Sequence, residues 1–70
     1  MEREIILRNH IKERRAALNM SQEYLALEIG VDRITIGNIE RGDTKPSVLT
    51  ALQIAQVLCV SVHDIFEINN

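Results

Sequence analysis

The stretch Ser21–Gly42 constrains the fold of this chain more than any other segment, because helix-starting and helix-ending residues alternate along it. Ser21 is an N-cap residue, and its hydroxyl can accept a hydrogen bond from the first turn of a helix that begins at Gln22. The apolar face expected of that helix consists of Leu25, Ala26 and Ile29. Gly30 can take the left-handed conformation that ends a helix at little steric cost.

A second short helix is predicted directly after this glycine. Asp32 is its candidate N-cap, the run from Arg33 to Arg41 is its body, and Gly42 follows as a second terminator. Two short helices joined by a glycine turn of about three to four residues form the helix-turn-helix motif. We therefore expect such a motif at about residues 21–42.

The two faces of the second helix differ in chemistry. At about 100° per residue, Ile36 and Ile39 point one way, with Thr35 at the margin. The opposite arc carries Arg33, Ile34, Gly37, Asn38 and Arg41. A solvated surface is the ordinary interpretation of such an arc. Two features favour a binding face instead. The first is Gly37 in mid-helix, which lowers helix stability by roughly 1 kcal/mol relative to alanine and permits another backbone to approach closely. The second is that Arg and Asn are the side chains that pair with guanine and adenine edges.

The order of residues resembles that of small Cro/C1-type (XRE-type) helix-turn-helix regulators over residues 9–66. The matching segments read MSQEYLALEIGVDRITIGNIERG, then KPS, then ALQIAQVLCVSVHDIF. The resemblance implies a mainly α fold, a five-helix lambda-repressor-like DNA-binding domain that spans residues 1–70 as a single domain. It also implies a sequence-specific double-stranded DNA-binding transcriptional regulator, acting as a repressor and as a homodimer on a near-palindromic operator.

The resemblance carries over to particular side chains. The residues implied to contact bases are Arg33, Ile34 and Asn38. The residues implied to contact phosphates, or to brace a base-reading side chain, are Gln22, Thr35, Arg41 and Lys45. Base contacts specify sequence, whereas phosphate contacts set the register of the protein on the duplex.

A first helix is expected to begin at Asn9 as cap and to run to about Leu18, with Ile11 and Leu18 facing inward. Arg15 lies on or near the apolar side of this helix, where an unpaired charge is costly. The resemblance implies that Arg15 forms a partly buried ion pair with Glu40, which has a structural role.

Two further helices are expected in the C-terminal part. Ser47 caps the first of them, which runs to about Leu58, and Ser61 caps a last short helix. The core stripe of the longer helix consists of Ala51, Ile54, Ala55 and Leu58. The candidate dimer contacts are Val62, Ile65, Phe66 and Ile68, although core filling explains Ile65 equally well.

Both chain ends carry short apolar runs. Ile5–Leu7 favours a strand, although an early start of the first helix is an alternative. Some dimeric members of the family carry a small sheet made from the two termini. Pairing of Ile5–Leu7 with Phe66–Ile68 would give such a two-stranded antiparallel sheet here.

The charge of the chain is unevenly distributed. The formal net charge is −2, which argues against a nucleic-acid binder driven by charge alone and predicts weak non-specific binding. All eight Lys and Arg residues lie between Arg3 and Lys45, so one half of the chain is suited to face phosphate and the other to face protein.

Several classes of function find no support in the sequence. A single cysteine excludes an internal disulfide, and no metal-ligand spacing or nucleophile with an adjacent base appears, so we expect no enzyme, no cofactor and no metal. The absence of a long apolar run or a signal peptide predicts a cytoplasmic protein with no membrane partner. The alternative to a DNA-binding regulator is a protein-interaction module such as an antitoxin or an adaptor, which can also autoregulate its own operon.

Overall fold

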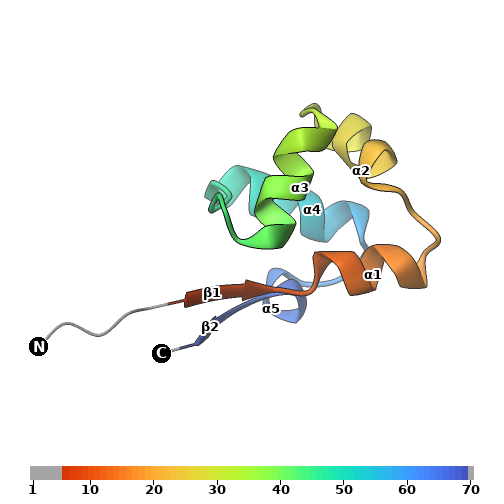
Figure 1. Ribbon diagram of the computed structural model, residues 1–70. Helices are drawn as coiled ribbons and strands as arrows, with labels where there is room; N and C mark the ends of the chain where they lie inside the picture. The colour runs from red at the N-terminus through yellow and green to blue at the C-terminus, as the bar shows by residue number, and fades with distance from the viewer. Residues whose placement is uncertain (1–5, 70) are drawn as a thin grey trace, which may run out of the picture.

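The computed structural model describes residues 6–69, which fold into a helical body and a two-stranded ribbon that projects from it (Figure 1). The elements in chain order are β1 (Ile6–Asn9), α1 (Ile11–Ala17), α2 (Gln22–Ile29), α3 (Arg33–Arg41), α4 (Val48–Val57), α5 (Val62–Ile65) and β2 (Phe66–Asn69). The mainly α, five-helix lambda-repressor-like fold with a small antiparallel sheet is the fold expected from the sequence.

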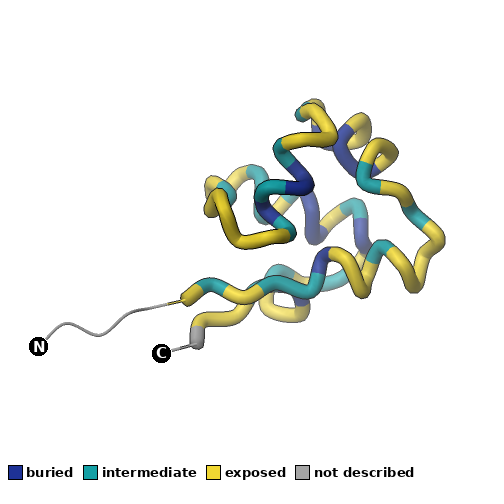
Figure 2. The backbone as a smooth tube through the Cα atoms, viewed as in Figure 1, coloured by how far each residue is buried: buried dark blue, intermediate teal, exposed yellow. Residues whose placement is uncertain are grey.

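Every helix contributes one completely buried aliphatic side chain to a single core. These side chains, each 0% exposed, are Ile11, Leu25, Ile36, Ile54 and Ile65. They are the largest fully buried side chains of the described residues. Figure 2 shows the buried segments of the helices turned toward one another within the helical body. Burial of one such side chain contributes about 1.5–3 kcal/mol, so these five positions provide a large part of what holds the helices together.

The helices of the motif begin and end where the sequence predicts. The Ser21 hydroxyl accepts a hydrogen bond from the Tyr24 backbone N–H at 3.0 Å. The Asp32 carboxylate accepts one from the Thr35 N–H at 2.9 Å. Both helices then end on left-handed glycines, Gly30 with φ 77° and Gly42 with φ 83°. The turn between α2 and α3 is thus fixed by local chemistry at both of its ends.

The two ends of the described chain pair as an antiparallel ribbon, with Leu7 opposite Ile68 and Asn9 opposite Phe66. This pairing favours the strand over an early start of α1. The strand is shifted along the chain relative to the prediction, because it continues to Asn9, which is the residue opposite Phe66. The predicted member Ile5 lies outside the described residues.

The structure corrects the prediction for Leu18 and decides between the two alternatives for Ile65. Leu18 was expected in the core but is 49% exposed, because α1 ends at Ala17 and the backbone at Leu18 no longer follows the helical period. For Ile65, dimer contact and core filling were both open, and its 0% exposure in the core selects core filling. None of the helices within residues 6–69 has the length and apolar character needed to span a membrane.

Candidate nucleic-acid interface

Helix α3 turns one face to the core and another to solvent. Ile36 and Ile39 are buried, whereas Arg33 and Ile34 at the start of the helix and Arg41 at its end are exposed. The exposed side is therefore a mixed surface of guanidinium and aliphatic groups that starts at the first turn of the helix.

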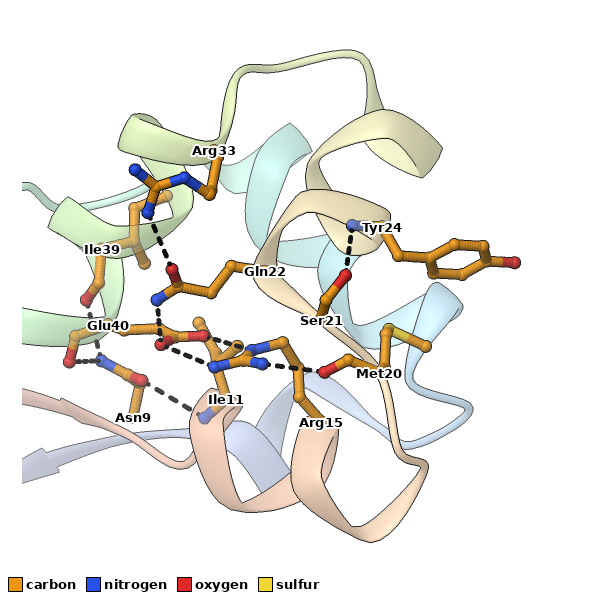
Figure 3. A network of polar contacts seen from close by, with 10 residues as sticks. All are labelled: Asn9, Ile11, Arg15, Met20, Ser21, Gln22, Tyr24, Arg33, Ile39 and Glu40. Carbon is orange, nitrogen blue, oxygen red and sulfur yellow. Dashed lines mark hydrogen bonds and ion pairs between the residues drawn. The ribbon is translucent and has the colours of Figure 1, made fainter.

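Arg33 is held in place by the helix before it. Its Nη1 atom donates a hydrogen bond to Oε1 of Gln22 at 3.3 Å (Figure 3). Arg33 is the first residue of α3, and Gln22 is the first residue of α2. The turn between the two helices thus brings their N-terminal ends within hydrogen-bonding distance, and the structure brings together the glutamine and the arginine that the sequence singles out.

A buried ion pair lies directly behind Gln22. Arg15 donates to Glu40 through Nε at 2.6 Å and through Nη2 at 3.1 Å, and the two side chains are only 11% and 7% exposed. Arg15 also donates from Nη1 to the Met20 carbonyl at 2.8 Å. The Gln22 amide donates from Nε2 to Oε1 of Glu40 at 2.9 Å. The Arg15–Glu40 pair implied by the resemblance is therefore present, and it connects α1, α2 and α3.

Asn9 adds a contact that sequence reasoning did not identify. Its side-chain amide donates to the Ile39 carbonyl at 3.0 Å, while its Oδ1 accepts from the Ile11 N–H at 3.3 Å. The sequence placed Asn9 at the N-cap of the first helix, but the N-cap of α1 is His10, and Asn9 is the last residue of β1. The bond from Asn9 to the Ile39 carbonyl joins residues thirty positions apart, which no local pattern reveals. Asn9 thereby fixes the start of α1 against the last turn of α3.

Gly37 lies on the outward arc of α3 but is not exposed there. It is buried, because the side chains of Arg41 and Gln22 lie over it. A Cβ atom at this position would lie 3.2 Å from Nη1 of Arg41 and 3.9 Å from Nε2 of Gln22. The glycine therefore leaves room for this chain's own side chains, and the close neighbours in the structure are not another backbone.

Arg41 and Asn38 form one polar group at the end of α3. Arg41 donates to the Asp43 carboxylate from Nε at 3.0 Å and to Oδ1 of Asn38 from Nη2. Asn38 is half-buried, and Arg41 and Asp43 are exposed. This arrangement places the Arg41 charge beside a carboxylate, so a nucleic-acid phosphate would compete with Asp43 for the guanidinium.

The remaining polar candidates have different settings. Thr35 donates its hydroxyl hydrogen to Asp32 at 2.8 Å, so it would have to give up this bond to donate to a phosphate. The hydrogen bonds from the Thr35 backbone and hydroxyl hold the pKa of the Asp32 carboxyl below its usual value, which keeps this N-cap ionised. Lys45 is exposed between α3 and α4. Lys12, which the sequence did not single out, borders a surface hollow together with Gln22 and Arg41.

The candidate dimer residues lie at the ribbon and α5. Val62 and Phe66 are half-buried and Ile68 is exposed, and all three border one apolar depression together with Leu7. Within residues 6–69, no group of three His, Cys, Asp or Glu side chains is placed to hold a metal ion.

Comparisons with known proteins agree with this geometry. A sequence model of the helix-turn-helix family matches residues 11–65. The uncharacterised HTH-type transcriptional regulator YgzD of Bacillus subtilis is 42% identical over 60 residues, which are 86% of this chain and 91% of that protein. The P22 c2 repressor, solved with a synthetic operator, is 31% identical with a TM-score of 0.71 over 74% of this chain and 79% of its own. SinR of Bacillus subtilis, solved with DNA, is 35% identical with a TM-score of 0.69 over 76% of this chain and 86% of its own.

Proposed function

Because the chain belongs to the Cro/C1-type (XRE) helix-turn-helix family of DNA-binding transcriptional regulators, we propose that it is a repressor that binds a near-palindromic operator as a homodimer. Regulators of this family are not enzymes. The observation that carries this proposal is the exposed Arg33 at the first turn of α3, braced by Gln22. In a helix-turn-helix protein the second helix enters the major groove with its N-terminal residues nearest the bases.

The base contacts follow from the side chains at the exposed face of α3. Arg33 is suited to guanine, because its guanidinium can donate to O6 and N7 together. Ile34 is exposed and can meet the methyl group of a thymine. Asn38 lies one turn further along and can read an adenine or bond a phosphate, once its Oδ1 is released from Arg41.

Phosphate contacts are assigned to polar groups that flank these three residues. Gln22 lies at the N-terminal end of α2, and Arg41 and Lys45 lie at and beyond the end of α3. Thr35 is a further phosphate candidate that first has to leave Asp32. With a formal net charge of −2 on the chain, binding depends on these few local charges and not on the field of the whole protein.

The dimer is assigned to the apolar depression at the ribbon and α5. Val62, Phe66 and Ile68 supply its contacts, and Ile65 stabilises the fold beneath them. Two copies joined there would present two α3 helices to half-sites about one helical turn, roughly 34 Å, apart.

The proposal is tested by titrating a preferred duplex, and its single-base variants, with the wild type and two substituted proteins. Arg33→Ala should lose about 1–3 kcal/mol on the preferred duplex and should relax the preference at one base pair only. Lys45→Ala should weaken binding by the same factor on every duplex and reduce the salt slope by about one. Arg14→Ala is a matched control, because Arg14 is an exposed arginine of α1 that lies near Asp64 of α5.

The base-reading proposal is wrong if Arg33→Ala and Arg14→Ala have equal effects on all duplexes. In that case the arginine contributes only charge.

One observation favours a second function, that of a protein-interaction module such as an antitoxin or an adaptor. Helix α4 carries no charged residue, and its first two turns expose Val48, Leu49 and Leu52. Exposed apolar side chains that lie together are typical of surfaces that bind another protein. A function that survives Arg33→Ala and Asn38→Ala but is lost on Leu49→Asp would favour this second interpretation.

A further inference from the structure

We propose that Glu40 is a positioning residue for base recognition, in addition to its part in the buried ion pair: it orients the amide of Gln22, which in turn orients the guanidinium of Arg33. This inference rests on the proposed function, because it assumes that Arg33 reads a base. It adds that the identity of the base is read through a relay of side chains that starts inside the protein (Figure 3).

The first step is the chemistry of Glu40. An ionised carboxylate only accepts hydrogen bonds, so the Gln22 side chain can face Oε1 of Glu40 only with its NH2 group, at 2.9 Å. The Glu40 side chain is 7% exposed, so water has little access to replace this partner. The carboxylate therefore selects one of the two orientations of the Gln22 amide.

The second step is the consequence for Arg33. With the NH2 group of Gln22 turned to Glu40, its Oε1 faces Arg33 and accepts the hydrogen bond from Nη1 at 3.3 Å. The flipped amide would instead present a donor to a guanidinium, which has no acceptor. One amide orientation braces Arg33 and the other repels it.

The third step is the rigidity of the carboxylate itself. Arg15 occupies both oxygens of Glu40, at 2.6 Å and 3.1 Å. Arg15 in turn donates a hydrogen bond from Nη1 to the Met20 carbonyl at 2.8 Å. Rotation of the carboxylate would break these bonds, so the orientation of Gln22 is fixed from behind. A side chain that is already held in its binding geometry loses less conformational entropy when it meets its partner.

The experiment is Glu40→Gln, measured as binding to the preferred duplex and to duplexes changed at each base pair. A glutamine of the same shape can donate as well as accept, so it no longer dictates the orientation of Gln22. Discrimination at the base pair that Arg33 contacts should fall at least about fivefold, the low end of what a bidentate base contact provides. In the Arg33→Ala background, Glu40→Gln should cause no further loss of discrimination at that base pair.

Asp43→Asn is the matched control. It makes the same carboxylate-to-amide change in the exposed pair with Arg41, outside the relay. It should change affinity for all duplexes by a common factor and leave the discrimination at the Arg33 base pair intact.

A uniform effect of Glu40→Gln on all duplexes would overturn the relay and leave Glu40 with a stabilising role alone. If Glu40→Gln does not fold, Gln22→Leu provides the second test, since it removes the relay and leaves both Arg15 and Glu40 in place. Full discrimination at the Arg33 base pair in Gln22→Leu would likewise overturn the relay. A wild type that shows no sequence preference overturns the proposed function itself, which is a result distinct from either of these.

Discussion

Replacing Gly37 by alanine sets two effects of known size against each other. Glycine in mid-helix is about 1 kcal/mol less favourable than alanine, and the backbone at Gly37 is not among the positive-φ positions that need glycine. Against this gain, the new methyl group would lie 3.2 Å from Nη1 of Arg41. That atom is the far end of a flexible side chain, and the Arg41 side chain is 61% exposed, so it can move by a few tenths of an ångström at small cost.

We therefore expect Gly37→Ala to raise the free energy of unfolding by about 0.5–1 kcal/mol. Urea denaturation followed by far-UV circular dichroism measures this change. Gly37→Val is the control, because a β-branched side chain is a poorer helix former than alanine and crowds Arg41 further, so it should fall below the alanine variant in stability.

The same Gly37→Ala variant should bind DNA more weakly than the wild type, because the methyl group displaces Arg41 from the position over Gly37 that it now occupies. A chain that becomes more stable and binds less well would show that the glycine is retained for the interface. A loss of stability on Gly37→Ala would refute the steric reasoning, and unchanged binding would refute the role of this site in recognition.

Three further predictions follow from individual contacts. Arg15→Met leaves the buried carboxylate of its partner without a cation and should cost about 3–5 kcal/mol of unfolding free energy; a loss below about 1 kcal/mol in urea denaturation would contradict the importance of the pair. Hydrogen bonds that the His10 ring donates to the carboxylates of Glu13 and Glu67 raise the pKa of His10 in the folded protein. The resulting stabilisation should be complete below the pKa of unfolded histidine, about 6.5, and should disappear as the pH rises through the folded value. Unfolding free energies measured across this range should show the decline in the wild type and not in His10→Gln. Cys59 is exposed and has φ 60°, a backbone conformation that glycine adopts more easily than cysteine. Cys59→Gly should therefore raise the melting temperature. The gain in unfolding free energy should be about 1 kcal/mol or less, because glycine also increases the entropy of the unfolded chain.

The sequence was sufficient for features that depend on local chemistry. Ser21 and Asp32 cap helices because their side chains reach a backbone N–H three residues on, and Gly30 and Gly42 end helices because they tolerate positive φ. These caps and terminating glycines together predict the first and last residues of both helices of the central motif.

The sequence was insufficient where tertiary packing decides. The helical period places Leu18 inward, but the period ceases to apply when α1 ends one residue earlier. Gly37 falls on the outward arc of α3, yet the long side chains of Arg41 and Gln22 fold back over it. The second role of Asn9 depends on α3 lying beside the start of α1, which only the folded chain reveals. In each case the answer depends on a neighbour that is distant in sequence or on the path of a flexible side chain.

The most direct test of sequence-specific recognition by a dimer is selection of this protein against a pool of random DNA duplexes at low salt, followed by sequencing of the retained molecules. We predict an enriched inverted repeat with half-site centres about 10 base pairs, one helical turn, apart. We also predict that the position read by Arg33 is occupied by guanine. Retention of duplexes without any enriched sequence, by protein whose fold is verified by circular dichroism, would contradict the account and favour the protein-interaction function.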